Sequence, residues 1–315
     1  MATAYSLSLD ASAALTRRVT WLSVATALIL TALKAGVWLA TGSVSILASL
    51  ADSGLDFIAA VGSFAAVRYA VVPPDAEHRF GHGKAEAFAS LVQAGLVFAS
   101  AALVGQEAIV RLLHPQPVQR EGWAIGAMAV SMGLTGLLVT AQTRVLRQAR
   151  SVAVTGDRAH YLADLASNVV ALIAIAASAL LGLGGVDALG GLAVAALLLW
   201  GAVSVFRQAS DELMDHELPD DARARIVALM TEDPRLTDVH QLRTRAAGPT
   251  VHIQMHADLD PELSLELAHE VVVAAEKRVL EAFPSADIII HADPRGRAEP
   301  HGGAFAEMEA QAGLE

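Results

Sequence analysis

Six apolar stretches constrain the fold of this chain more than any other feature of its sequence. A helix needs about 20 apolar residues to cross the hydrocarbon layer of a membrane. Only TGS (41–43) separates the first two stretches and GLGG (182–185) the last two, so each of these pairs is expected to form antiparallel neighbours. We therefore predict a polytopic α-helical membrane protein with six transmembrane helices, at residues 17–40, 43–70, 87–113, 121–146, 158–183 and 187–207.

Basic residues at the ends of these helices predict the orientation in the membrane, because cytoplasmic loops carry an excess of Lys and Arg. One set of helix ends carries ten Lys and Arg residues, whereas the opposite set carries only Arg111 and Arg120. Both termini are therefore expected in the cytoplasm, which agrees with an even number of spans. The ten basic residues of the cytoplasmic ends are Arg17, Arg18, Arg68, Arg79, Lys84, Arg144, Arg147, Arg150, Arg158 and Arg207.

The charge distribution separates a membrane part from a water-exposed part. Only 17% of the residues are charged, against about a quarter in soluble domains. Residues 19–50 contain a single ionisable side chain, Lys34, which we interpret as a snorkelling or structural residue rather than a ligand. The last hundred residues, in contrast, are dense in charge. The net charge of −11 argues against a nucleic-acid partner. Because the chain has no cysteine, any metal ion must be held by His and carboxylate side chains.

After Arg207 the sequence pattern becomes that of a small C-terminal α+β domain. Helical periodicity covers two segments and strand-like alternation covers three, which gives the order α-β-β-α-β. We predict a transmembrane domain at 10–208, a second domain at 209–294 and a mobile tail at 295–315. The elements expected after the spans are helices at 220–233 and 264–283, a hairpin of 239–246 with 250–259, and a third strand at 286–293.

Two of the spans carry ionisable residues at helical spacing. Asp52 and Asp56 share one face of the second span, since positions i and i+4 are neighbours on a helix. In the fifth span His160, Asp164 and Asn168 follow at the same interval. A lone Asp in such a helix is more often a protonated hydrogen-bonding group or an interhelical contact. Two such pairs favour a metal or proton site, and four N/O ligands suit a tetrahedral ion such as Zn²⁺.

A loop between the second and third spans contains a further candidate metal site. In VPPDAEHRFGHGKAE (72–86), Asp75, His78 and His82 are spaced so that a compact loop could bind an ion. A solvated, charged loop explains the same residues equally well. Lys84 is a candidate for an ion pair.

Five of the eleven histidines lie between residues 240 and 291. Period-two alternation places His256 on one strand face with His252, and His291 on another with Asp293. Single histidines of this kind are usually ordinary surface residues. Their joint pattern favours a metal site in the C-terminal domain.

Five motifs make the sequence similar to the cation diffusion facilitator family, especially its bacterial zinc and iron efflux members. The resemblance extends over about residues 10–294 and implies six transmembrane helices, a cytoplasmic metallochaperone-like domain and a homodimer. The motifs are TGSVSILASLADSGLD (41–56), HRFGHGKAEAFASL (78–91), HYLADLASN (160–168), HQLRTRAAGPT (240–250) and IIIHADP (288–294).

The resemblance also implies roles for particular residues, but none for His252. Lys84 would form an ion pair with Asp215 that links the two parts across the dimer. A His in place of Asp52 would suggest stricter zinc selectivity. The implied metal ligands are Asp52, Asp56, His160 and Asp164 for transport, Asp75, His78 and His82 in the loop, and His240, His256, His291 and Asp293 around two ions, with His269 as an extra or cross-dimer ligand.

These expectations combine into a function. The predicted protein exports Zn²⁺, and also Cd²⁺ or Fe²⁺, from the cytoplasm across a bacterial inner membrane by proton antiport with alternating access. Its partners would be a second copy of the chain, protons as the counter-substrate and membrane lipid. An intramembrane metalloprotease is disfavoured because the spans contain no HExxH motif. The alternative is a membrane-anchored divalent-metal sensor without transport.

Overall fold

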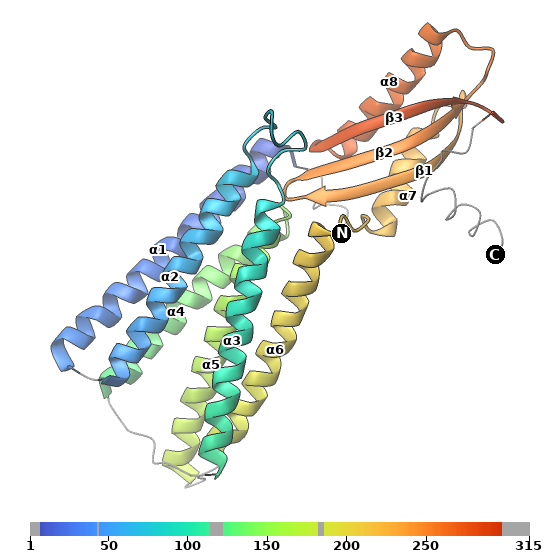
Figure 1. Ribbon diagram of the computed structural model, residues 1–315. Coiled ribbons are helices and arrows are strands. Elements are labelled where there is room, and N and C mark those ends of the chain that lie inside the picture. Colours follow the sequence, from blue (N-terminus) through green and yellow to red (C-terminus); the bar gives the residue numbers. More distant parts are fainter. Residues whose placement is uncertain (1–6, 43, 114–121, 182–185, 298–315) are drawn as a thin grey trace. The chain divides into compact units, whose positions relative to one another are not determined.

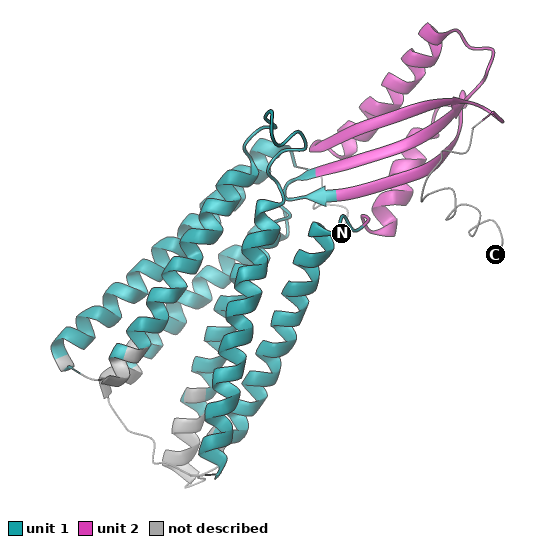
Figure 2. Cartoon of the chain, viewed as in Figure 1, with its two compact units in different colours: residues 1–216, 246–250 teal, residues 217–245, 251–315 magenta. Residues whose placement is uncertain are grey.

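The computed structural model describes residues 7–42, 44–113, 122–181 and 186–297 (Figure 1). It divides into two compact units, one of residues 1–216 with 246–250 and the other of residues 217–245 with 251–315 (Figure 2). The predicted domain boundary at residue 208 stays a prediction. Most of the predicted tail, residues 298–315, lies outside the described residues.

Six long helices make up the first unit, one for each predicted span. By length and hydropathy, five of the described helices qualify as membrane spans, α1 to α4 and α6. The remaining helix, α5, is the one that carries His160 and Asp164. The helices are α1 (Leu9–Thr41), α2 (Val44–Ala70), α3 (Ala85–Leu113), α4 (Gly122–Leu146), α5 (Val152–Leu181) and α6 (Val186–Leu213).

The ends of α1 follow ordinary capping chemistry. The Ser8 hydroxyl accepts a hydrogen bond from the Ala11 backbone N–H, which satisfies one of the open donors of the first turn. At the other end Gly42 adopts a left-handed conformation (φ 64°), and its N–H donates to the carbonyl of Trp38. Glycine suits this position because it has no Cβ to clash.

Small side chains let α3, α5 and α6 approach closely. Their shared core contains Ala101, Ala163 and Ala202 together with Val97, Val194 and Leu198. Small residues are characteristic of helix contacts in membranes, where packing rather than the hydrophobic effect drives association. At Gly191 of α6 the approach is so close that an added Cβ would lie 2.9 Å from the Cβ of Ala108 on α3.

The second unit holds the rest of the chain in the predicted order α-β-β-α-β. The strands form one sheet in the order β1-β2-β3, with β2 and β3 parallel. Gly248 (φ 57°) and Pro249 alone connect β1 to β2, a link that suits an antiparallel pair. The elements are α7 (Asp220–Met230), β1 (Leu236–Ala247), β2 (Thr250–Leu259), α8 (Leu265–Ala282) and β3 (Ala286–Pro294).

Alternation along β2 separates a core face from a polar face. Val251, Ile253 and Met255 are buried, and Ile226 of α7 and Val271 of α8 are also fully enclosed. Residues at the intervening positions, including His256 and Asp258, share the opposite face of the sheet.

The fold class predicted from the sequence, a helical membrane domain followed by a C-terminal α/β domain, is confirmed.

Close packing at Gly191 predicts that Gly191→Ala destabilises the membrane unit. Overpacking a tight contact costs about 1–3 kcal/mol, so the unfolding temperature of the detergent-solubilised protein should fall. The matched control is Gly133→Ala on α4, where an added Cβ meets no atom within 4 Å. That variant should unfold at the same temperature or slightly higher, because Ala favours helices more than Gly does. Equal behaviour of the two variants would contradict the close contact of α3 and α6.

Candidate metal centres

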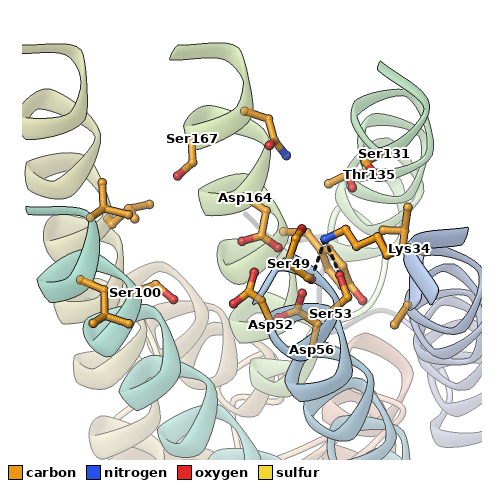
Figure 3. A pocket seen from close by; sticks show the side chains of 17 residues that line it. Lys34, Ser49, Asp52, Ser53, Asp56, Ser100, Ser131, Thr135, Asp164 and Ser167 are labelled. Atoms are coloured by element: carbon orange, nitrogen blue, oxygen red, sulfur yellow. Dashed lines mark hydrogen bonds between the residues drawn. The ribbon is translucent and has the colours of Figure 1, made fainter. Parts of the chain in front are cut away.

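A cavity of about 250 Å³ lies among the helices of the first unit (Figure 3). Asp52 and Asp56 of α2, Asp164 of α5 and Lys34 of α1 all line it. Residues of α3, α4 and α6 complete the lining, so each of the six helices contributes: Ser100, Ser131, Thr135 and Leu198 are among them. Three of the four predicted transport ligands, Asp52, Asp56 and Asp164, therefore line one cavity.

Asp56, His160 and Asp164 form a tight cluster between α2 and α5. Their ligand atoms lie within 4.8 Å of one another. His160 Nε2 is 2.8 Å from Asp56 Oδ1 and 3.8 Å from Asp164 Oδ2, and the imidazole is almost fully buried. Asp52 lines the same cavity one turn away on α2, but among the described residues the close group consists of the other three.

A buried carboxylate near this cluster was missed by the sequence analysis. Asp157 lies one turn before His160 on α5 and is 1% exposed. Its Oδ2 accepts a hydrogen bond from Gln142 Nε2 at 2.8 Å, and its Oδ1 accepts one from Gln93 Nε2 at 3.4 Å. These bonds connect α5 to α4 and α3. The available signal was a second acid on the same helix, two turns before Asp164.

In the loop between α2 and α3, Asp75, His78 and His82 form a second cluster within 4.8 Å. His78 Nδ1 is 3.3 Å from Asp75 Oδ1, and His82 Nε2 is 3.4 Å from Asp75 Oδ2. The carbonyl of Val72 lies 3.2 Å from His82 Nδ1. A carbonyl can only accept, so this contact favours the tautomer whose Nε2 lone pair faces Asp75.

The loop backbone keeps Asp75 ionised. The N–H of His78 donates to its Oδ1 at 2.6 Å, and that of Glu77 donates to the same atom at 2.9 Å. These bonds, that from His78 foremost, hold the pKa of Asp75 below its usual 3.8. Asp75 therefore keeps the negative charge that a metal ligand needs down to a lower pH than an ordinary aspartate does.

The third cluster lies on the polar face of the sheet in the second unit. It consists of His240 of β1, His256 of β2 and Asp293 of β3, with ligand atoms again within 4.8 Å. Asp293 Oδ2 is 2.7 Å from His256 Nδ1 and 3.4 Å from His240 Nε2. The pairing of β2 with β3 places Asp258 beside Asp293 and His256 beside His291.

Three further residues surround this third cluster. His291 Nε2 is 3.3 Å from the other oxygen of Asp293, so this carboxylate faces imidazoles on both sides. Asp258 Oδ1 lies 3.7 Å from His240 Nδ1 and was not predicted, although period two places it on the face of His256. His269 is exposed on α8. It is not one of the three residues that form the close group in the described part of the chain.

Lys84 and Asp215 form an ion pair within a single chain, whereas the predicted link across a dimer stays a prediction. Lys84 Nζ is 2.9 Å from Asp215 Oδ1 and 3.2 Å from the carbonyl of Leu213. Both side chains are 37% exposed, which places the pair among surface contacts worth at most about 1 kcal/mol. The pair needs no second copy of the chain to form.

Each cluster combines imidazole nitrogens with carboxylate oxygens, the donors that suit zinc and neighbouring divalent ions. Three protein ligands leave one position of a tetrahedral site for water or another ligand. The two oxygens of Asp293, facing different histidines, fit a carboxylate that bridges two ions. The residues therefore fit metal ions in all three places.

Comparisons with known proteins agree with this architecture. Residues 20–214 match the cation efflux transmembrane domain, and residues 218–295 match the cytoplasmic domain of cation efflux proteins. The chain therefore belongs to the cation efflux family. It is a multi-pass membrane transporter with a cytoplasmic C-terminal domain, and not an enzyme.

Similar proteins include the cation-efflux pump FieF of Shewanella oneidensis, 42% identical over 272 residues, 86% of this chain and 92% of the relative. The cation-efflux pump FieF of Serratia proteamaculans is 40% identical over 86% of this chain and 90% of its own length. Among solved structures, CzrB in a zinc form is 33% identical, with a TM-score of 0.26 over 27% of this chain and 99% of that structure. The metal-bound C-terminal domain of the CzcD transporter from Thermotoga maritima is 30% identical, with a TM-score of 0.24 over 25% and 93%.

Acidification is predicted to release zinc from the loop cluster through its histidines. Imidazoles titrate between about pH 5 and 8, whereas Asp75 stays ionised in that range. Zinc affinity of a variant that keeps the loop cluster but lacks His160 and His256 should therefore fall steadily as the pH drops from 7.5 to 5, as measured by equilibrium dialysis. The same titration of Glu77→Gln, whose side chain is outside the cluster, serves as control. Affinity that is independent of pH over this range would exclude imidazole ligation.

Proposed function

We propose that this cation efflux transporter exports divalent metal ions from the cytoplasm, with Zn²⁺ as its main substrate and Cd²⁺ or Fe²⁺ as others. The observation that carries the proposal is the Asp56–His160–Asp164 cluster, because Asp56 and Asp164 line a cavity to which all six membrane helices contribute and His160 lies against both of them. Ionisable residues at membrane depth usually mark an ion pathway, because their burial is costly. Two carboxylates and an imidazole are the donor types that bind Zn²⁺.

In this proposal Asp52 is the fourth ligand of the transported ion. It belongs to the same helix as Asp56 and lines the same cavity (Figure 3). A small rotation of its side chain or of α2 would complete a tetrahedral set of three carboxylates and one imidazole. Such a mixed set accepts several divalent ions, since carboxylates are less selective for zinc than histidines are.

Exchange for protons follows from the chemistry of these ligands. Metal binding requires a neutral imidazole and ionised carboxylates, so protons and metal compete for the site. Protons arriving from outside displace the ion, and the protonated carrier returns to the cytoplasmic side. Among the ligands, His160 is the side-chain type whose charge changes at physiological pH. Alternating access arises when the helices around the cavity open to one side at a time.

We further propose that two copies of the chain assemble in a bacterial inner membrane with both termini in the cytoplasm. The match to the cation efflux cytoplasmic domain and the bacterial relatives support this assembly and location. Resident ions in the loop cluster and in the His240–His256–Asp293 cluster would stiffen these regions and link them to cytoplasmic metal. A sensor without transport is not retained, because the chain belongs to a family of efflux transporters.

Removing a ligand of the cavity site is predicted to abolish export. Asp164→Ala and Asp56→Ala should each lower zinc uptake into proteoliposomes at least about tenfold, since loss even of an indirect partner of a metal ligand costs 10- to 100-fold in affinity. Asp52→Ala should do the same if Asp52 is the fourth ligand. A matched control is Glu107→Gln, an exposed acid on α3 that pairs with Arg111. Wild-type uptake by Asp164→Ala would contradict the transport site.

Proton exchange makes a separate prediction. With a pH-sensitive dye in the lumen of the proteoliposomes, zinc uptake should change lumenal pH in the direction of protons leaving. The change should disappear in Asp164→Ala together with the uptake. Zinc transport that leaves the lumenal pH constant would exclude antiport while preserving the site.

A further inference from the structure

Lys34 places a cation beside the carboxylates of the transport cavity. It lies on α1 and lines the cavity together with Asp52, Asp56 and Asp164. In Figure 3 its side chain extends from α1 toward α2.

Hydrogen bonds hold the Lys34 ammonium in this position. Nζ donates to the hydroxyl of Ser53 at 2.5 Å and to the carbonyl of Ser49 at 3.2 Å, both on α2. Nearby, the Thr31 hydroxyl donates to the carbonyl of Ser53 at 2.9 Å, a second contact between α1 and α2. A lysine in a membrane helix commonly extends its charge to the interface. Here it turns inward, toward the acids.

The charges of the cavity explain what such a cation can do. Three ionised carboxylates, Asp52, Asp56 and Asp164, carry a charge of −3, and a neutral His160 adds none. The ammonium of Lys34 reduces the total to −2. One divalent ion then neutralises the cavity, and low-dielectric surroundings penalise any charge that is left over.

We propose that Lys34 is a fixed counter-cation that matches the transport cavity to a divalent substrate and weakens metal binding enough for release. The inference rests on the proposed transport function of this cavity. It assigns Lys34 a positioning and charge-setting role without contact to the metal. A cation that is always present also lowers the repulsion among the three acids after the ion has left.

The direction of the change in zinc affinity tests this role. In full-length protein carrying His82→Ala and His256→Ala, which disable the other two clusters, calorimetry with zinc reports on the cavity. Lys34→Gln should bind zinc about tenfold tighter or more, because a nearby positive charge has been removed. Lys34→Arg should restore the affinity of the background protein. A purely structural Lys34 predicts weaker or unchanged binding for Lys34→Gln, which would overturn the proposal.

Transport kinetics provide an independent measurement. In proteoliposomes Lys34→Gln should lower both KM and the maximal rate of zinc uptake, since a tighter site releases its ion more slowly. The matched control is Lys277→Gln, which changes an exposed lysine on α8 and should leave both values unchanged. If Lys34→Gln does not fold, Lys34→Met removes the same charge with a side chain of similar length.

One further variant separates failure of this inference from failure of the transport site itself. If Asp164→Ala in the same background binds zinc as well as its parent, the cavity is not the metal site and both proposals are wrong. If Asp164→Ala loses zinc binding but neither Lys34→Gln nor Lys34→Met tightens it, the transport site stands and the role of Lys34 is wrong.

Discussion

A carboxylate at the depth of a bilayer costs about 2.5–3.5 kcal/mol on insertion scales, and the arrangement of the membrane helices follows from the need to offset this cost. Asp56 lies against the imidazole of His160, and Asp157 accepts hydrogen bonds from two glutamines. Lys34 adds a positive charge from α1. These contacts join α1, α2, α3, α4 and α5 around a polar interior, so the same interactions that make the acids tolerable also assemble the cavity.

Packing elsewhere in the membrane unit depends on small side chains rather than on polar contacts. Ala101, Ala163 and Ala202 lie where α3, α5 and α6 meet, and Gly191 brings the backbone of α6 next to Ala108.

The core of the C-terminal unit depends on strand alternation instead of small side chains. There an alternating strand pattern buries one face of β2 and leaves His256 on the other, where strand pairing lines up the third cluster. The transporter thus combines a lipid-facing helical bundle with an ordinary aqueous α/β fold.

The sequence predicted the helices and strands to within several residues, because hydropathy and periodicity are local properties. The sequence also named every residue of the three clusters, some from helical or strand spacing, as for Asp56, His160 and Asp164, and others only through the family resemblance, as for His240. It missed Asp157 and Asp258, and it predicted a snorkelling or structural role for Lys34. The partners of these residues lie on other helices or strands, at no fixed interval along the chain.

The sequence by itself determined which segments enter the membrane, which face of each helix or strand is polar, and which residue types are available to bind metal. The tertiary structure decided which of these residues meet. It set Asp56, His160 and Asp164 within ligand distance with Asp52 one turn away, left His269 exposed, and turned Lys34 inward. Periodicity specifies a direction around a single helix or strand, whereas a site between elements depends on how their surfaces pack against one another.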